Sequence, residues 1–285
     1  MRELKGACAI ITGASRGLGR HIARALAGEG MRLVLAARDA AGLAEAAGEV
    51  RARGAEALVV PTDVADADAL AALVAAAERE FGGADVVVNN AGIELALAHH
   101  KLAPDEIEGI VRVNLTAPLL LTRFALPGML ARRRGHVVNI ASLAAKACPP
   151  YEGVYAATKA GLLAFTHALR GELRGRGVGA SAVLPGFVSE AGMYADSIRG
   201  SGVSAPALVG EVSPAAVARA VVRAIRRDLP EVLVTHGPVR LLAALGQLYP
   251  PLVERVTRAS GAAELFRRVA ERRERERAAE ATPSG

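Results

Sequence analysis

The stretch that decides the fold is Thr12-Gly13-Ala14-Ser15-Arg16-Gly17-Leu18-Gly19, which follows an apolar run and precedes a helical pattern. A strand, a glycine-rich turn and a helix in this order form the start of a βαβ unit. Gly13 permits a tight turn, Gly17 lets backbone amides approach a pyrophosphate, and Gly19 allows the helix to pack closely on the strand. The stretch therefore predicts a dinucleotide-binding site, although a glycine motif alone can also be an ordinary turn.

Short apolar runs alternate with helical patterns along most of the chain. The predicted strands are 7–11, 32–36, 55–60, 85–89, 136–140, 179–184 and 231–235. The predicted helices are 17–29, 40–53, 66–81, 104–132, 152–175 and 214–228. Uninterrupted Val, Ile and Leu runs separated by helices indicate a parallel sheet buried on both faces. Right-handed crossovers then give an α/β fold, a Rossmann-like doubly wound parallel sheet of about seven strands with helices on both faces.

The composition fits one soluble α/β domain. The 285 residues are 52% hydrophobic, and the two cysteines suit neither a disulfide framework nor a metal site. Cys8 lies in the first apolar run and is expected in the core. The net charge of +6 does not indicate nucleic-acid binding, because arginines of 267–277 alternate with glutamates and no nucleic-acid motif is present. Without a secretory signal or a membrane-length apolar run, the protein is expected in the cytoplasm with no membrane span.

The end of the second predicted strand indicates which dinucleotide binds. An NAD site normally has a carboxylate there for the ribose 2′-hydroxyl, but the position is Ala37. Arg38 follows, and Arg16 in the glycine turn could reach the same region. Two guanidinium groups favour the 2′-phosphate of NADP(H) over NAD(H). Asp39 leaves two interpretations open: a ribose-binding carboxylate in a shifted register or, favoured here, the cap of the next helix.

Tyr155 and Lys159 lie four residues apart in a helical pattern, so their side chains share one face. A neighbouring ammonium favours the phenolate and lowers the tyrosine pKa from its usual value of about 10. Such a phenol can exchange a proton with an alcohol or a ketone. Ser142 precedes the pair, at the end of an apolar run.

These motifs resemble, in order, those of the short-chain dehydrogenase/reductase family over roughly residues 5–235. Further matches are Asp63-Val64, Asn89-Asn90-Ala91-Gly92, Asn114 and Pro185-Gly186. The resemblance implies that the cofactor is held by Gly13, Ser15, Arg16, Gly17, Leu18, Gly19, Arg38, Asp63, Val64, Asn90, Ala91, Gly92, Tyr155, Lys159, Pro185, Gly186 and Val188.

The resemblance also implies four catalytic residues. Ser142 would hydrogen-bond the substrate oxygen, and Tyr155 would give it a proton while the nicotinamide delivers hydride to the carbon. Lys159 would lower the pKa of Tyr155 and hold the nicotinamide ribose. Asn114, at a distortion of its helix, would position a water molecule that links Lys159 to solvent.

Several of these residues have structural alternatives. Ser142 could be a helix cap at the strand end, Asn114 a satisfied buried amide, and Asp63 a cap for the helix near residue 66. Glu152 lies near the expected substrate entrance but could simply favour the start of its helix. His99 and His100 are adjacent and lack partners at ligand spacing, so no metal site is predicted.

The substrate pocket is expected from segments 93–100, 143–151 and 186–212. Its predicted lining is Leu95, Leu97, Leu143, Ala147, Cys148, Pro149, Tyr151, Phe187, Met193 and Tyr194. This mostly apolar lining favours a lipophilic ketone, aldehyde or alcohol, such as an acyl chain, a steroid-like ring or a xenobiotic carbonyl. Residues 189–213 are rich in Gly, Ser and Ala and suggest a lid.

The chain is predicted to divide into a catalytic part, 1–237, and a helical extension, 238–285. The extension would contain helices 238–256 and 262–279 and a frayed end, 282–285. It could cover the substrate pocket, form a subunit interface, or make a weak membrane contact through 238–256.

A homodimer is expected, with a tetramer less favoured. In the family, the helices that correspond to 104–132 and 152–175 pair between subunits. Small residues on the second helix would permit close packing: Ala157, Ala160, Gly161 and Ala164.

Three functions were compared on this sequence. The favoured one is an NADP(H)-dependent oxidoreductase that interconverts a ketone or aldehyde and an alcohol. A non-catalytic NADP(H)-sensing module would be expected to lack the Ser142, Tyr155 and Lys159 set, which this chain retains. A lyase or epimerase of the same superfamily would need a larger and less apolar C-terminal part.

Overall fold

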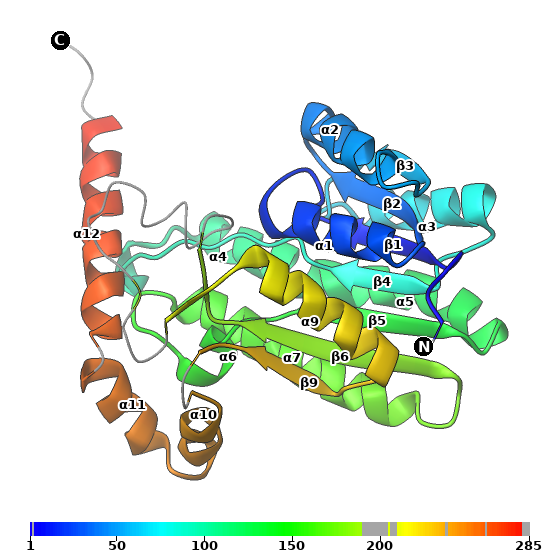
Figure 1. The fold of residues 1–285 in the computed structure, drawn as a ribbon. Coiled ribbons are helices and arrows are strands. Elements are labelled where there is room, and N and C mark those ends of the chain that lie inside the picture. The colour runs from blue at the N-terminus through cyan, green and yellow to red at the C-terminus, as the bar shows by residue number, and fades with distance from the viewer. Residues whose placement is uncertain (2, 190–204, 206–209, 237–238, 260, 281–285) are drawn as a thin grey trace.

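The computed structural model describes residues 1, 3–189, 205, 210–236, 239–259 and 261–280. Its centre is a seven-stranded parallel sheet in the order β3-β2-β1-β4-β5-β6-β9 (Figure 1). The strands are β1 (Cys8–Thr12), β2 (Arg32–Ala37), β3 (Ala57–Pro61), β4 (Val86–Asn89), β5 (Gly135–Ile140), β6 (Val178–Pro185) and β9 (Glu231–Val234). The order reverses between β1 and β4, which makes the carboxyl ends of these two strands the expected ligand position.

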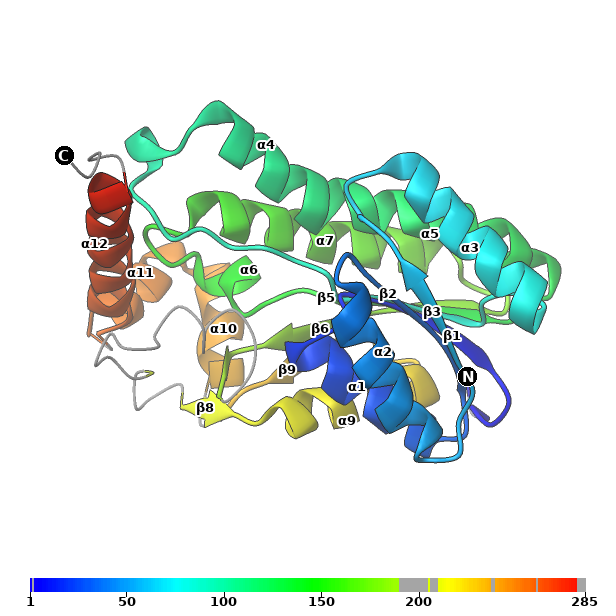
Figure 2. The same ribbon diagram turned by 90° about the horizontal axis from the view of Figure 1, so that it is seen from above.

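Helices cover both faces of the sheet, as Figure 2 shows. One layer is α1 (Gly17–Gly28), α2 (Ala40–Arg51) and α9 (Pro214–Arg227). The other is α3 (Ala67–Phe81), α4 (Pro104–Val111), α5 (Ala117–Ala131) and α7 (Gly153–Glu172), and a π-helical turn, Arg112–Thr116, joins α4 to α5. Alternate residues of β1 enter different cores: Ala9 and Ile11 pack with α1, α2 and α9, whereas Cys8 and Ile10 pack with α3 and α5. The predicted α/β fold and the core position of Cys8 are confirmed.

The last part of the chain forms α10 (Val239–Leu248), α11 (Pro250–Ala259) and α12 (Ala262–Glu280). The single helix predicted over 238–256 is wrong, because the chain breaks before Pro250 and Pro251, whose rings cannot continue the preceding helix. The short helix α6 (Ala144–Ala147) and a two-stranded sheet, β7 (Phe187–Val188) with β8 (Glu211–Val212), were not predicted. Most of the predicted lid, and the predicted frayed end 282–285, lie outside the described residues.

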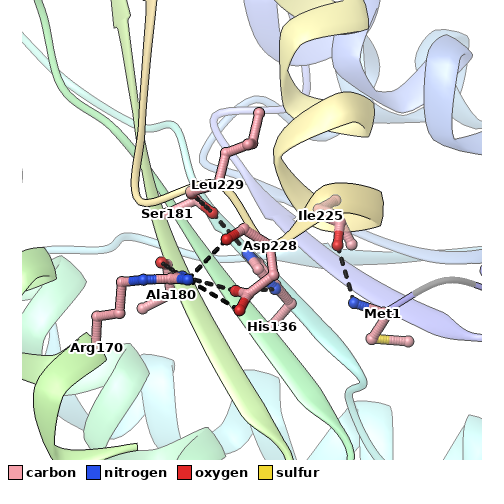
Figure 3. Close-up of polar contacts among 8 residues, drawn as sticks. All are labelled: Met1, His136, Arg170, Ala180, Ser181, Ile225, Asp228 and Leu229. Carbon is pink, nitrogen blue, oxygen red and sulfur yellow. Dashed lines mark hydrogen bonds and ion pairs between the residues drawn. The ribbon is translucent and has the colours of Figure 1, made fainter. Parts of the chain in front are cut away.

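A buried polar cluster joins the amino-terminal halves of β5 and β6 to the segment after α9 (Figure 3). The His136 Nε2 atom lies 2.8 Å from the Ser181 hydroxyl, and its Nδ1 atom lies 3.9 Å from Asp228 Oδ1. Arg170 donates to both carboxylate oxygens of Asp228, at 2.6 and 2.9 Å. Ser181 is fully buried and donates its proton to the Leu229 carbonyl, so this Ser-His-Asp arrangement cannot act as a hydrolase site.

The burial of His136 predicts that the fold loses stability in mild acid. Burial lowers the pKa of His136 from 6.5 to about 3, so between these values the unfolded chain binds a proton that the folded chain does not. The free energy of unfolding should therefore fall by about 2 kcal/mol between pH 7 and pH 5 from this residue alone. Urea unfolding at both pH values should show a smaller difference for His136→Gln than for wild type. His99→Gln, at an exposed position, is the control, and an equal pH dependence in wild type and His136→Gln would contradict the assignment.

Candidate active site

The glycine turn presents an open helix terminus at the carboxyl end of β1. Helix α1 begins at Gly17, and it has no side-chain cap and no acidic residue in its first turn. A Cβ atom on Gly19 would lie 2.1 Å from the Gly13 carbonyl oxygen, and one on Gly13 would lie 3.0 Å from the Ala91 Cα atom. This close packing and the amide groups at the start of α1 fit a pyrophosphate.

The turn is fixed to the end of β4 by hydrogen bonds. The Thr12 hydroxyl oxygen accepts from the amides of Asn90 and Ala91, at 3.0 and 3.1 Å. The Asn90 side chain donates to the carbonyls of Thr12 and Gly13, at 2.9 and 3.2 Å. Residues 90–92, expected beside the cofactor, thus lie directly against the glycine turn.

The residues expected around the adenosine are exposed at the same edge. Arg38 follows β2, and Arg16 precedes α1. Asp39 caps α2, because its carboxylate accepts from the Gly42 amide at 3.1 Å, and this favours the capping interpretation. The capping alternative for Asp63 is wrong: its Oδ1 accepts from Ala65, while Asp66 caps α3.

Ser142, Tyr155 and Lys159 meet at the carboxyl end of β5. The Ser142 side chain is near enough to the Tyr155 hydroxyl to act on its pKa, and the Lys159 ammonium lies 5.6 Å from the centre of the Tyr155 ring. Lys159 also donates to the Ile140 carbonyl at 2.9 Å. The Ser142 oxygen also accepts from the Ala144 amide at 3.1 Å, in the turn that leads into α6. The N-cap of α6 is Leu143 and no side chain caps this helix, so the capping interpretation of Ser142 is not supported.

The pKa of Tyr155 is raised in this structure, whereas the sequence predicted that it would be lowered. Burial and the nearby carboxylate of Glu94 raise the pKa of Tyr155, and the hydrogen bond from Ser142 opposes them. Burial lowers the pKa of Lys159 to about 8, although Glu94 opposes the shift. The prediction failed because sequence spacing shows that the two side chains share a face but not how far the pair is removed from water.

Asn114 lies in the π-helical turn between α4 and α5, which confirms the predicted helix distortion. Its side chain is fully buried and joins the backbone of Ile93, accepting from the amide and donating to the carbonyl, both at 2.8 Å. It also donates to Thr158 at 3.3 Å. The structure therefore gives Asn114 the role of a satisfied buried amide, and a water relay to Lys159 stays a prediction.

The segment at the end of β6 lies beside Ser142. The Leu143 amide donates to the Pro185 carbonyl at 2.8 Å, and the Gly186 amide donates to Val234 at 3.0 Å. Val188 is buried in β7. The Pro185-Gly186 turn thus adjoins Ser142, as the cofactor prediction requires.

The predicted substrate-lining segments lie together at this end of the sheet. The Leu97 amide donates to the Tyr151 carbonyl at 2.9 Å, which joins segments 93–100 and 143–151. Leu97 and Pro149 are buried, Cys148 is exposed, and the others are partly buried: Leu95, Leu143, Ala147, Tyr151 and Phe187. Met193 and Tyr194 lie outside the described residues.

Helix α12 packs over the same end of the sheet (Figure 1). Leu265 and Val269 bury Ala96, and the Phe266 ring lies 6.2 Å from the Phe187 ring. Two ion pairs, Lys101–Glu274 and Arg277–Glu106, attach α12 to the start of α4. These contacts favour the lid interpretation for α12, whereas α10 exposes an apolar stripe formed by Leu241, Leu245 and Leu248.

Glu152, placed near the substrate entrance by the sequence but not among the predicted site residues, is a buried acidic group. It is 3% exposed and holds the N-cap position of α7, as the helix-start interpretation expects, although its side chain makes no capping hydrogen bond. The charges of Glu94 and of Arg273 in α12 both act on it. The signal in the sequence was an acidic residue three positions before the tyrosine, but its contacts come from segments far away in the chain.

Metal binding and membrane insertion receive no support from the described residues. No group of three His, Cys, Asp or Glu side chains there could hold a metal ion, and His99 and His100 are exposed. One helix, Pro104–Ala131, is long and apolar enough to cross a membrane. In this structure it is the α4–α5 segment, which packs against α3, α7 and the sheet.

A model of the short chain dehydrogenase family matches residues 7–232. The chain belongs to the short-chain dehydrogenase family. The family resemblance of its motifs is thereby confirmed, and the protein is an oxidoreductase of the alcohol–carbonyl class.

Two curated relatives are reductases. Ketoacyl reductase HetN of Nostoc sp. is 44% identical over 280 residues, which cover 96% of each chain. A 3-oxoacyl-[acyl-carrier-protein] reductase of Synechocystis sp. is 36% identical over 66% of this chain and 77% of its own. The HetN alignment is long enough to include most of the C-terminal extension.

Two solved structures of similar proteins contain the phosphorylated dinucleotide. A single-residue variant of actinorhodin polyketide ketoreductase with NADPH has a TM-score of 0.76 and 34% identity, and covers 82% of this chain and 97% of that one. A metagenomic short-chain oxidoreductase in complex with NADP has a TM-score of 0.70 and 35% identity, with 81% and 97% covered.

Proposed function

We propose that this protein is an NADPH-dependent reductase of 3-oxoacyl thioesters, which converts the ketone to a secondary alcohol. The observation that carries the proposal is the meeting of Ser142, Tyr155 and Lys159 at the end of β5, in a chain 44% identical to a ketoacyl reductase. The partly apolar segments 93–100 and 143–151 support an acyl substrate over a charged one.

In the proposed reaction, the residues of the chain bind the substrate carbonyl and supply the proton. When bound, the nicotinamide supplies a hydride to the substrate carbon. Ser142 holds the carbonyl oxygen, and Tyr155 donates its proton to that oxygen as negative charge develops there. The raised pKa of Tyr155 keeps the phenol protonated before reduction, as a proton donor requires. Lys159, nearly fully buried, places a positive charge beside the ring.

The cofactor assignment rests on the edge formed by Arg16 and Arg38. Both arginines are exposed there, and Asp39, the acidic residue that follows Arg38 at the end of β2, is engaged as a helix cap. Gly42, at the start of α2, lies against Ser15 of the glycine turn, so the two arginine-bearing segments are neighbours. This arrangement suits a 2′-phosphate.

Absorbance at 340 nm tests the function directly. A short 3-oxoacyl thioester should cause NADPH consumption by the purified protein, with NADH at least about tenfold less effective, since one charge-assisted contact contributes this much. Tight NADPH binding with no turnover on 3-oxoacyl thioesters or on other carbonyl compounds would contradict an enzymatic role and favour an NADP(H)-sensing module.

We also propose a cytoplasmic homodimer formed through α5 and α7. Ala157 and Ala164 are exposed on α7 and lie two turns apart, which leaves a smooth helix face for a second copy. Another of the four small residues, Gly161, instead packs on Leu115 of the same chain. Sedimentation of the full chain is expected to give twice the mass of 29.3 kDa, and Ala157→Arg should shift it toward the monomer. A monomeric wild type would contradict the proposal, and a wild-type tetramer would indicate a second interface.

A further inference from the structure

Glu152 stands out among the described residues as a buried acid with a carboxyl oxygen that makes no hydrogen bond. Glu152 immediately precedes α7 and is 3% exposed. Its Oε2 atom is buried and makes no hydrogen bond. Burying a carboxyl oxygen in this way costs stability, so a structural role does not account for it.

The position of Glu152 relates it to the reacting group. It is the N-cap residue of α7 and lies three positions before Tyr155, which belongs to the first turn of that helix. Its charge is close enough to raise the pKa of Tyr155. A substrate whose ketone oxygen lies at Tyr155 would therefore bring its neighbouring atoms toward Glu152.

The groups that face Glu152 fix its protonation state at neutral pH. Burial and the carboxylate of Glu94 raise the pKa of Glu152 to about 9, and Arg273 of α12 opposes the shift. The Arg273 guanidinium donates to the Glu94 carbonyl at 3.4 Å, so the extension holds this segment in place. A protonated carboxyl group can donate one hydrogen bond and accept another.

We propose that Glu152 is a specificity-determining residue, which donates a hydrogen bond from its carboxyl group to the second carbonyl oxygen of a 3-oxoacyl substrate. This inference rests on the proposed function and adds a residue to it. In such a substrate the thioester carbonyl is separated from the reacting ketone by one carbon. Tyr155 and Ser142 bind the first oxygen and Glu152 binds the second, so a ketone without the second oxygen leaves the carboxyl group unpaired.

The test compares two substrates rather than one rate. The quantity measured is kcat/KM for a 3-oxoacyl thioester divided by kcat/KM for a monoketone of similar length, with NADPH saturating. Glu152→Leu should lower this ratio by about 10- to 100-fold, the usual discrimination lost with one buried hydrogen bond. Glu152→Gln keeps a donor and should recover most of the ratio. Glu172→Leu, an exposed carboxylate at the other end of α7, should leave the ratio unchanged.

Two further measurements separate a binding role from a structural one. Thermal unfolding should show that Glu152→Leu is at least as stable as wild type, because it removes an unpaired buried carboxyl group. The wild-type ratio should decrease as the pH rises through about 9, where the carboxyl group of Glu152 ionises, and Glu152→Gln should not show this decrease.

The outcomes distinguish this inference from the proposed function. An unchanged ratio in Glu152→Leu, with a wild type that prefers the 3-oxoacyl thioester, would overturn the role of Glu152 alone. A wild type that reduces monoketones but no 3-oxoacyl thioester would overturn the proposed substrate and this inference together. A ratio that falls equally in Glu152→Gln and Glu152→Leu would show that shape, not hydrogen bonding, sets the preference.

Discussion

Replacing Tyr155 with phenylalanine is expected to lower kcat by roughly 10³-fold, because the substitution removes the proton donor and little else. Tyr155 is buried beside Ser142, and phenylalanine keeps the ring that lies under the Lys159 ammonium. The affinity for NADPH should change by less than about threefold, since the glycine turn and the two arginines are untouched. NADPH consumption measures the first quantity, and NADPH fluorescence titration measures the second.

Tyr249→Phe provides a matched control for this experiment. Tyr249 is 54% exposed and lies between α10 and α11, away from the Ser142 and Lys159 contacts. Its loss of a hydroxyl should leave kcat unchanged. Retention of most of the activity in Tyr155→Phe would show that another group supplies the proton and that the assignment of Tyr155 is wrong.

Gly19→Ala is expected to damage both the fold and the cofactor site. The added Cβ atom would lie 2.1 Å from the Gly13 carbonyl oxygen and 2.7 Å from the Asn90 side chain, and the backbone oxygen cannot move without distorting the turn. We expect the free energy of unfolding to fall by about 3 kcal/mol, which corresponds to a decrease of roughly 10 °C in Tm. NADPH affinity should fall by at least about 100-fold, because the amides of the turn would no longer meet the pyrophosphate.

Gly28→Ala is the control on the same helix. Gly28 ends α1, and no atom lies within 4 Å of the Cβ position there. Alanine should therefore be neutral or slightly stabilising in thermal unfolding. If Gly19→Ala bound NADPH as tightly as Gly28→Ala does, the close approach of α1 to the turn would not be a requirement of the site.

The strands and the motif positions could be predicted from the sequence because they depend on local patterns. Each strand of the seven-stranded sheet is a short apolar run, and its observed ends differ from the predicted ones by two residues at most. The glycine turn, Asn114 and the Tyr155–Lys159 pair belong to motifs whose spacing is fixed by one helix or one turn. The helix distortion at Asn114, which the family resemblance implied, is present as a π-helical turn.

The contacts that could not be predicted join segments far apart in the chain. The pKa of Glu152, at the start of α7, depends on the charges of Glu94 in the loop after β4 and of Arg273 in α12. No local sequence pattern links these three residues. The predicted lowering of the Tyr155 pKa was wrong for the same reason, because the burial of Tyr155 by several segments outweighs the effect of one neighbouring ammonium group. The break before Pro250 was signalled by two adjacent prolines, which the apolar pattern of 238–256 concealed.

The weak attachment of α12 determines which part of the molecule unfolds first. Its hydrogen bonds to Glu94, after β4, and to Glu106, in α4, span 179 and 171 residues, so they close very long loops. They are supported by a small apolar cluster and by partly exposed ion pairs, which contribute little free energy. In hydrogen exchange, the backbone amides of α12 should therefore exchange together and well before those of the sheet. Detachment of α12 would uncover the substrate end of the enzyme while the sheet remains folded.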